Sequence, residues 1–316
     1  MLRTTIMSSS ETVFLIDTGA GMAQGSRPDQ EDRYVFILPD QFPADTVDKL
    51  ALFAIFDGHG SASVAEHARK NLPQLLVKRP EFEAGDYDTA IAEAFVDEDE
   101  ALLNKFMSHS TEPAVSGSTV ALCFANLTKG ILVVGNLGDS HIVLAERDLS
   151  GGKPINVQRL TKAHKPGHAD EKARIREAGG SVNNSTGTTR VGSLNMSRAL
   201  GDLQYKNPVN TMDDEMSAKS RTAAVVPPGN RGDFLSNKAH LSRVNLSPEK
   251  RYALVCSSDG VSDSTDEKAL LEHVMRSSST GERARDIAQE IVNVTAARYG
   301  SDNSTCIVAL LDGTKT

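Results

Sequence analysis

The chain has 316 residues, 39% of them apolar and 24% charged, which is typical of a soluble globular protein with one large domain or two small ones. Its 42 acidic and 34 basic residues give a formal net charge of −8, which argues against a nucleic-acid partner because such proteins cluster Lys and Arg. No apolar run is long enough for a membrane span, and the first residues lack the apolar core of a secretory signal.

The first third of the chain predicts three short strands followed by two helices. Apolar segments rich in β-branched and aromatic residues, typical of strands, cover residues 12–16, 33–38 and 50–56. Residues 61–76 and 86–107 then place apolar side chains at helical spacing, so each of these two segments predicts an amphipathic helix.

The later elements continue this grouping of strands with strands and helices with helices. Further strands are expected at residues 118–126, 130–136, 140–146, 251–258 and 304–311. Further helices are expected at residues 169–180, 267–278 and 282–300. Helices that come in pairs between groups of strands favour an α+β fold, in which helices cover antiparallel sheets, over a doubly wound parallel sheet.

Strand-like segments lie near both ends of the chain, so we expect one domain at residues 13–316, preceded by a tail at residues 1–12. Residues 204–245 are the exception, because they are polar, rich in Asn, Ser, Lys and Pro, and without clear periodicity. This composition predicts a long surface insertion that forms a flap.

Three cysteines lie in apolar, strand-like segments: Cys123, Cys256 and Cys306. We expect buried thiols in a reducing compartment, which favours a cytoplasmic location, with the nucleus as an alternative. A catalytic thiolate is the competing interpretation. A phosphate-binding cysteine loop would need Arg six residues after the cysteine, and those positions hold Lys129, Ser262 and Asp312.

Carboxylates recur where an apolar strand begins or ends beside a turn residue, at Glu31, Asp32, Asp57, Asp139, Asp259 and Asp302. Any one of them alone is explained as a turn residue. Repeated in one chain, they predict that strands sharing one end of the molecule bring the acids together. Such carboxylates repel one another, and a divalent cation removes the repulsion. Oxygen ligands without a neighbouring Cys or His pair favour Mg²⁺ or Mn²⁺ over Zn²⁺.

The segment FDGHG at residues 56–60 concentrates an acid, an imidazole and two glycines directly after an apolar strand. The glycines allow a sharp turn, and they allow the carbonyl of Gly58 to approach a metal ion. The P-loop, nucleophile-elbow and zinc-helix patterns do not occur in the sequence, which leaves chemistry assisted by a hard cation as the favoured interpretation.

The ordered motifs of the chain resemble those of the metal-dependent protein serine/threonine phosphatases of type 2C. The motifs are RPDQEDRY, FAIFDGHGS, SGSTVALC, VVGNLGDSHIVL, LTKAHKP, RIREAGG, LNMSRALGD, SSDGVSD and SDNSTCIVAL. The similarity extends from about residue 13 to residue 311. The resemblance implies an αββα sandwich, in which two antiparallel β-sheets are flanked by pairs of helices.

The resemblance also implies a role for each residue of the site. Two core ions, Mg²⁺ or Mn²⁺, would be bridged by Asp57 and held by the Gly58 carbonyl and the side chains of Glu31, Asp32, Asp259 and Asp302. Asp139 and Asp259 would bind a third, weaker ion. Arg27 would grip the phosphate and His59 would act as the general acid, with Asp57 counted among the catalytic residues because it bridges the ions.

These roles imply hydrolysis of phosphoserine and phosphothreonine in protein substrates by a monomeric enzyme involved in signalling. Two metal ions lower the pKa of a bridging water, so a nucleophile exists near neutral pH. Hydrolysis of small phosphate esters is an alternative, and so is a pseudophosphatase that only binds a partner. The chain departs from the family pattern at Gln30, His141 and Ser262, where Asn, Arg and an aromatic residue are usual, but no presumed ligand is lost.

Overall fold

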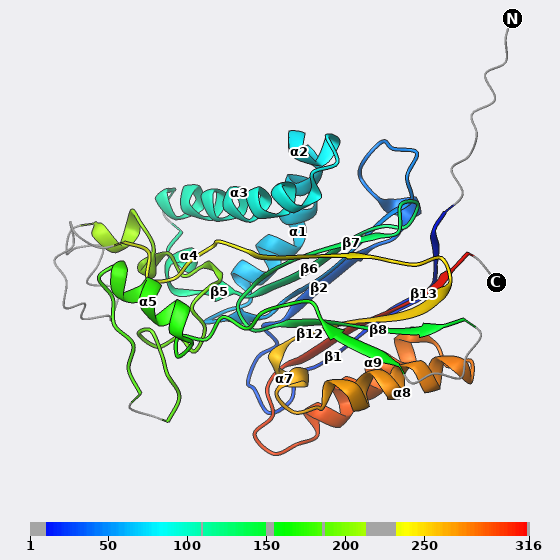
Figure 1. The fold of residues 1–316 in the computed structure, drawn as a ribbon. Helices are drawn as coiled ribbons and strands as arrows, with labels where there is room; N and C mark the ends of the chain where they lie inside the picture. The colour runs from blue at the N-terminus through cyan, green and yellow to red at the C-terminus, as the bar shows by residue number, and fades with distance from the viewer. Residues whose placement is uncertain (1–10, 109, 150–154, 185–186, 213–231, 315–316) are drawn as a thin grey trace, which may run out of the picture.

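The computed structural model describes residues 11–108, 110–149, 155–184, 187–212 and 232–314. Within these residues two five-stranded antiparallel sheets stack face to face, with helices on both outer faces (Figure 1). The predicted αββα sandwich is confirmed. No helix in the described part of the chain is long and apolar enough to cross a membrane.

The strands of the first sheet come from both ends of the chain. Their spatial order is β1 (Val13–Ala23), β13 (Ser304–Gly313), β12 (Lys250–Ser257), β8 (His141–Asp148) and β9 (Asn156–Arg159). The second sheet has the order β11 (His240–Asn245), β7 (Ile131–Leu137), β6 (Val120–Asn126), β3 (Leu50–Phe56) and β2 (Arg33–Ile37). A small third sheet orders β10 (Leu200–Gly201), β5 (Gly117–Ser118) and β4 (Gly58–His59).

Helices cover each large sheet from outside. The second sheet is covered by α1 (Ser63–Lys78) and α3 (Tyr87–Met107), and the first by α8 (Glu267–Ser279) and α9 (Ala284–Ala296) (Figure 1). The described residues also form shorter helices: α2 (Pro80–Glu83), α4 (Glu112–Val115), α5 (Ala169–Glu177) and α7 (Asp259–Ser262). Single 3₁₀ turns are η1 (Pro39–Gln41), η2 (Leu203–Tyr205) and η3 (Val209–Thr211).

Strand β3 shows why the sequence of the central strands is apolar without alternation. Ala51, Phe53 and Ile55 belong to the core between the two sheets. Leu52 and Phe56 point to the opposite face and pack in the core beneath α1 and α3. Because both faces are buried, the strand needs apolar residues at every position, and β3 is therefore one uninterrupted apolar run.

The interpretation of residues 204–245 as a surface insertion is wrong at both ends of that segment. Residues 240–245 form β11, which pairs with β7 at the edge of the second sheet. Tyr205 and Leu235 are buried in a small core that also contains Ile175 of α5. Residues 213–231 lie outside the described part of the chain, so the structure describes no flap there. The error arose because β11 is polar and half-exposed and gives no apolar pattern.

Candidate metal centre and active site

The registers of the two large sheets bring the predicted acids to one end of the sandwich. The start of β2 lies opposite the end of β3, with Arg33 paired to Phe56, so Asp32 and Asp57 are neighbours. The end of β12 lies beside the starts of β13 and β8, with Ser257 opposite Cys306 and His141. Asp259, Asp302 and Asp139 therefore meet at the same end. In Figure 1 this end, marked by α7, lies away from the start of β1 and the end of β13.

Asp57 lies at the centre of the acid cluster. Burial raises the pKa of its carboxyl well above the usual range, and the nearby carboxylates of Asp259, Asp32, Asp139 and Asp302 raise it further. Since these four carboxylates all act on the Asp57 carboxyl, side chains that are distant in the sequence lie close together in the fold. Without a cation, part of this cluster has to hold protons at neutral pH.

The carboxyl groups of Asp32 and Asp259 also have raised pKa values. Burial raises the pKa of Asp32 to about 6, although the hydroxyls of Thr305 and Ser258 donate hydrogen bonds to its Oδ2 at 2.6 and 2.9 Å. Burial and then the charges of Asp139 and Asp263 raise the pKa of Asp259 to about 7. A carboxyl group that is buried and surrounded by other carboxylates is poised to bind a cation instead of a proton.

Glu31 lies at the edge of the cluster and is half-buried. Its backbone N–H donates to Oδ1 of Asn303 at 2.8 Å, which fixes it beside the segment that carries Asp302. Burial raises the pKa of Glu31, and the charges of His59 and Arg27 oppose that rise. The predicted phosphate-binding and proton-donating side chains are therefore within electrostatic reach of this acid.

Gly58 allows two of the presumed ligand segments to touch. A Cβ atom at Gly58 would overlap the carbonyl oxygen of Glu31 and would lie 3.2 Å from Cβ of Ala65 in α1. Only glycine lets the backbone after β3 pass this close to Glu31. The Gly58 carbonyl can therefore belong to the same site as the Glu31 side chain.

The donor set fits Mg²⁺ or Mn²⁺. Oδ1 of Asp32 and Oδ1 of Asp139 are buried and have no hydrogen-bond partner in the described structure, which is costly unless a ligand completes them. Within the described residues no three His, Cys, Asp or Glu side chains already surround one metal position. Small divalent ions keep several waters and need only one or two carboxylates each, so wider spacing suits them.

His59 is held by an acid that the sequence analysis did not select. Its Nε2 lies 2.5 Å from Oδ2 of Asp202, whose side chain is only 1% exposed. Burial by itself lowers the pKa of His59, but the charge and hydrogen bond of Asp202, with Asp139 and Glu31, raise it overall. The Asp202 carboxylate therefore favours the protonated ring beside the cluster.

The small third sheet explains how His59 and Asp202 meet. Gly117 of β5 pairs with His59 of β4 on one side and with Gly201 of β10 on the other. A Cβ at Gly117 would overlap the Asp202 carboxylate and approach Nε2 of His59. The motif LNMSRALGD contained a signal for Asp202, because this residue also follows a short strand and a glycine.

A buried ion pair supports the segment that presents Asp202. Asp99 of α3 accepts a hydrogen bond from the backbone N–H of Gly201 at 2.8 Å. Lys206 donates to the other oxygen of Asp99 at 2.5 Å and to the carbonyl of Ala199 at 2.7 Å. Residues 199–206 are thus tied to α3 on both sides of Asp202.

Arg27 lies at the mouth of the cluster. Its Nη2 donates to Oδ2 of Asp302 at 2.6 Å, and its side chain is 56% exposed. The loop is held in place because Ser26 N–H donates to the carbonyl of Ser301 at 3.0 Å. The guanidinium is therefore exposed at the surface while it remains paired with an acid of the cluster.

The corner of the cluster around Asp139 contains two further residues that sequence reasoning missed. Lys165 donates a hydrogen bond from Nζ to Oδ2 of Asp139. Burial and then the neighbouring charges of Asp139 and Asp302 raise the pKa of Asp263, although Lys165 opposes this. Asp263 follows Asp259 by four residues at the end of α7, a spacing that places both on one helical face and could have revealed it.

The departures from the family pattern are accommodated locally. Gln30 accepts a hydrogen bond from the backbone N–H of Asp32 at 3.0 Å and donates to the carbonyl of Ala23 at 3.1 Å, so it helps to place a presumed ligand. Burial and nearby cations lower the pKa of His141 to about 4, so the ring is neutral where an arginine is usual. The hydroxyl of Ser262 is buried and has no partner in the described structure.

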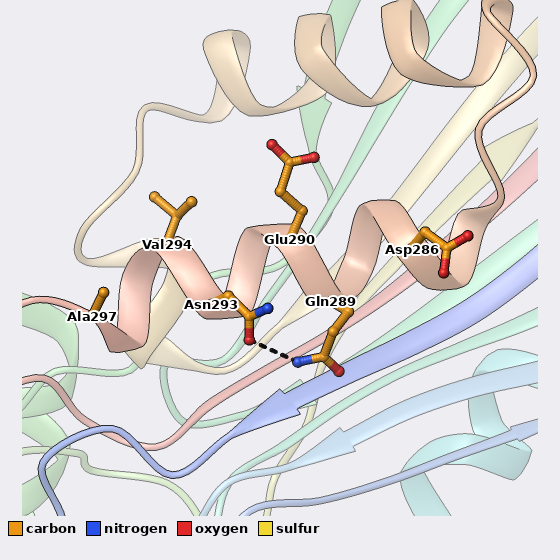
Figure 2. A pocket seen from close by; sticks show the side chains of 6 residues that line it. All are labelled: Asp286, Gln289, Glu290, Asn293, Val294 and Ala297. Atoms are coloured by element: carbon orange, nitrogen blue, oxygen red, sulfur yellow. Dashed lines mark hydrogen bonds between the residues drawn. The ribbon is translucent and has the colours of Figure 1, made fainter.

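A surface depression of about 490 Å³ lies elsewhere, along the exposed side of α9 (Figure 2). Gln289 donates to Asn293 at 2.9 Å across it, and Asp286 and Glu290 point in different directions (Figure 2). Because one helix supplies every residue that lines it and none belongs to the acid cluster, it is not the candidate site.

Comparisons with known sequences agree with this arrangement. The profile of the family described as protein phosphatase 2C matches residues 16–305. Protein phosphatase 2C homolog 3 of Schizosaccharomyces pombe is 32% identical over 301 residues, which cover 93% of this chain and 64% of that protein. Probable protein phosphatase 2C 2 of Paramecium tetraurelia is 28% identical over 310 residues, covering 92% of this chain and 91% of that protein.

Solved structures show the same fold. A serine-threonine phosphatase 2C from Toxoplasma gondii has a TM-score of 0.74 at 21% identity and covers 96% of this chain and 100% of its own. A sex determining protein of C. elegans has a TM-score of 0.72 at 22% identity, covering 94% of this chain and 65% of its own. Fold and sequence agree that the molecule is a metal-dependent phosphatase. The chain belongs to the protein phosphatase 2C family, whose members are Mg²⁺- or Mn²⁺-dependent protein serine/threonine phosphatases.

Proposed function

We propose that this chain hydrolyses phosphoserine and phosphothreonine monoesters in protein substrates with two core Mg²⁺ or Mn²⁺ ions. The observation that carries the proposal is the electrostatic state of Asp57, whose pKa is raised by burial and by four carboxylates from separate segments of the chain. Carboxylates clustered in this way repel one another, and binding of a hard divalent cation relieves the repulsion.

The residues that would hold the ions are Asp57 between them, with Glu31, Asp32, Asp259, Asp302 and the Gly58 carbonyl around them, and with Asp139 and Asp259 at a third ion. When bound, the ions supply a water of lowered pKa and screen the charge of the phosphoryl group. Ser258 and Thr305 orient Asp32 by donating to one of its oxygens, which leaves the other oxygen for a ligand.

Arg27 and His59 would act on the substrate. Arg27 can donate two parallel hydrogen bonds to phosphoryl oxygens, a geometry that lysine cannot match. His59 can give its proton to the departing serine or threonine oxygen, and Asp202 favours the protonated ring from which that proton comes. The exposed guanidinium and the half-buried imidazole both interact with the charge of Glu31.

The direct test is turnover of a phosphothreonine peptide by wild type and Asp57→Asn over a range of Mn²⁺ concentrations. We expect metal-dependent release of phosphate by the wild type and a loss of at least about a hundredfold in the variant, because the bridging charge is removed. Unchanged turnover in Asp57→Asn would refute the assignment. Hydrolysis of p-nitrophenyl phosphate but of no phosphopeptide would favour a small-ester substrate, and Mn²⁺ binding without any turnover would indicate a pseudophosphatase.

We further propose a cytoplasmic or nuclear monomer that acts in signalling. The three cysteines support the compartment, because all three are buried, unpaired thiols, as in proteins from reducing compartments. Burial raises the pKa of Cys123 well above its usual range and that of Cys306 to about 12, so these thiols are unreactive core residues. Fractionation of cells expressing a tagged chain and light scattering of the purified protein test the two proposals.

A further inference from the structure

Lys165 reaches the corner of the acid cluster where a third ion would bind. Its ammonium group donates to Oδ2 of Asp139, and it also interacts electrostatically with Asp259 and Asp263. Asp139 is 1% exposed, whereas the side chain of Lys165 is 31% exposed. The positive charge therefore lies among three carboxylates, at the end of a long side chain that still has an open path to solvent.

The backbone fixes this contact. The N–H of His164 donates to the carbonyl of Gly138 at 3.0 Å, and the N–H of Gly138 donates to Nδ1 of His164 at 3.1 Å. Gly138 has a φ of 90°, which glycine adopts readily. These two hydrogen bonds join the residues directly before Lys165 and Asp139, so the two side chains start from neighbouring and rigid positions.

A divalent ion at this corner would bind carboxylate oxygens directly beside the one that Lys165 now contacts. Oδ2 of Asp139 accepts the lysine N–H, and Oδ1 of Asp139 is buried without a partner in the described structure. An ion that binds both Asp139 and Asp259 would lie close to the ammonium, and two cations at that separation repel strongly in a partly buried site. The third ion and the lysine charge cannot share the corner.

We propose that Lys165 is a built-in competitor of the third metal ion. In the absence of the ion the ammonium offsets part of the negative charge of Asp139, Asp259 and Asp263. When the ion binds, Nζ must leave Asp139 and move to solvent, so the affinity for the ion is reduced by the cost of breaking the pair. The inference rests on the proposed metal centre, and it explains from this chain's own residues why a third ion would bind more weakly than the core pair.

The test is direct counting of bound Mn²⁺ by electron paramagnetic resonance in wild type, Lys165→Met and Lys165→Arg. Methionine keeps the length of the side chain and removes the charge, so we expect the weakest site to tighten by about tenfold or more. Arginine keeps the charge, so its weakest site should stay weak. Lys162→Gln is the matched control, because Lys162 pairs with Asp170 on the surface, and it should bind Mn²⁺ like the wild type.

Two results would overturn the inference while leaving the metal centre intact. One is a wild type that binds its core ions and a Lys165→Met variant whose weakest site is unchanged or weaker. The other is equal tightening in Lys165→Arg and Lys165→Met, which would show that charge is not the cause. A wild type that binds no Mn²⁺ at all would overturn the proposed function and this inference together. Thermal unfolding of each variant in chelator establishes that the compared proteins are folded.

Discussion

At the scale of single residues, the chemistry depends on a few side chains whose neighbours set their charge. His59 is the clearest example, because its ring is buried and yet its pKa is raised. The Asp202 carboxylate at 2.5 Å compensates for the burial. An imidazole whose pKa is raised in this way carries its proton in a larger fraction of molecules near neutral pH than a free histidine does.

We therefore expect the leaving group to separate His59 variants from wild type. His59→Gln should slow hydrolysis of a phosphoserine peptide by about 10²- to 10⁴-fold, the usual contribution of a general acid. It should slow p-nitrophenyl phosphate far less, because that leaving group needs no proton. Asp202→Asn should show the same pattern at smaller amplitude, whereas Asp170→Asn, at an exposed acid, should have no effect. Equal losses on both substrates would contradict the assigned role.

At the scale of elements, the ends of antiparallel strands explain most of the site. The acids at the starts of β2, β8 and β13 and at the ends of β3 and β12 meet because neighbouring strands run in opposite directions. The small sheet of β4, β5 and β10 brings His59 and Asp202 together in the same way, because β5 pairs with both of the other strands. Its outer strand β10 is held by the buried pair of Asp99 and Lys206 rather than by a long ladder of hydrogen bonds.

Removing one partner of this buried pair should destabilise the protein strongly. Lys206→Met leaves the Asp99 carboxylate buried without its cation, so we expect a loss of roughly 3–5 kcal/mol in the free energy of unfolding. Urea unfolding followed by circular dichroism measures this. The double variant Asp99→Leu with Lys206→Met should recover most of the loss, because no charge is then left unpaired. A cost below about 1 kcal/mol for Lys206→Met would show that the pair does not anchor β10.

At the scale of the whole molecule, the acid cluster makes stability depend on pH and metal in a defined direction. The pKa values of Asp32 and Asp259 are raised to about 6 and about 7 in the folded protein. These two carboxyls therefore bind more protons in the folded state than in the unfolded state between about pH 4 and pH 7, so the stability that they contribute is lost as the pH rises through that window. For Asp32 alone this is on the order of 3 kcal/mol.

The metal-free protein should accordingly melt at a lower temperature at pH 7.5 than at pH 5.5. Mn²⁺ should raise the melting temperature at pH 7.5 and have a smaller effect at pH 5.5, because at the lower pH protons compete for the same oxygens. Scanning calorimetry in chelator and in Mn²⁺ at both pH values measures the four melting temperatures. A chelated protein that is more stable at pH 7.5 would mean that the carboxylates do not repel one another.

Local signals in the sequence predicted antiparallel sheets covered by helices, with acids at the strand ends, whereas the two-sheet sandwich was implied by the family resemblance. Apolar strands such as β3 are continuous in the sequence, and each acid stands beside a strand end and a turn residue. The sequence did not indicate β11, whose residues are polar and half-exposed because it lies at a sheet edge. Nor did it single out Lys165 or Asp202, because their partners Asp139 and His59 are distant in sequence and are brought close only by the fold.

The most direct test of the central claim is anomalous diffraction from a crystal of the protein grown with Mn²⁺, measured at the manganese absorption edge. The account predicts two strong peaks within reach of the Asp57 carboxylate, among Glu31, the Gly58 carbonyl, Asp259 and Asp302. A folded protein whose crystals show no anomalous peak within reach of Asp57 would contradict it.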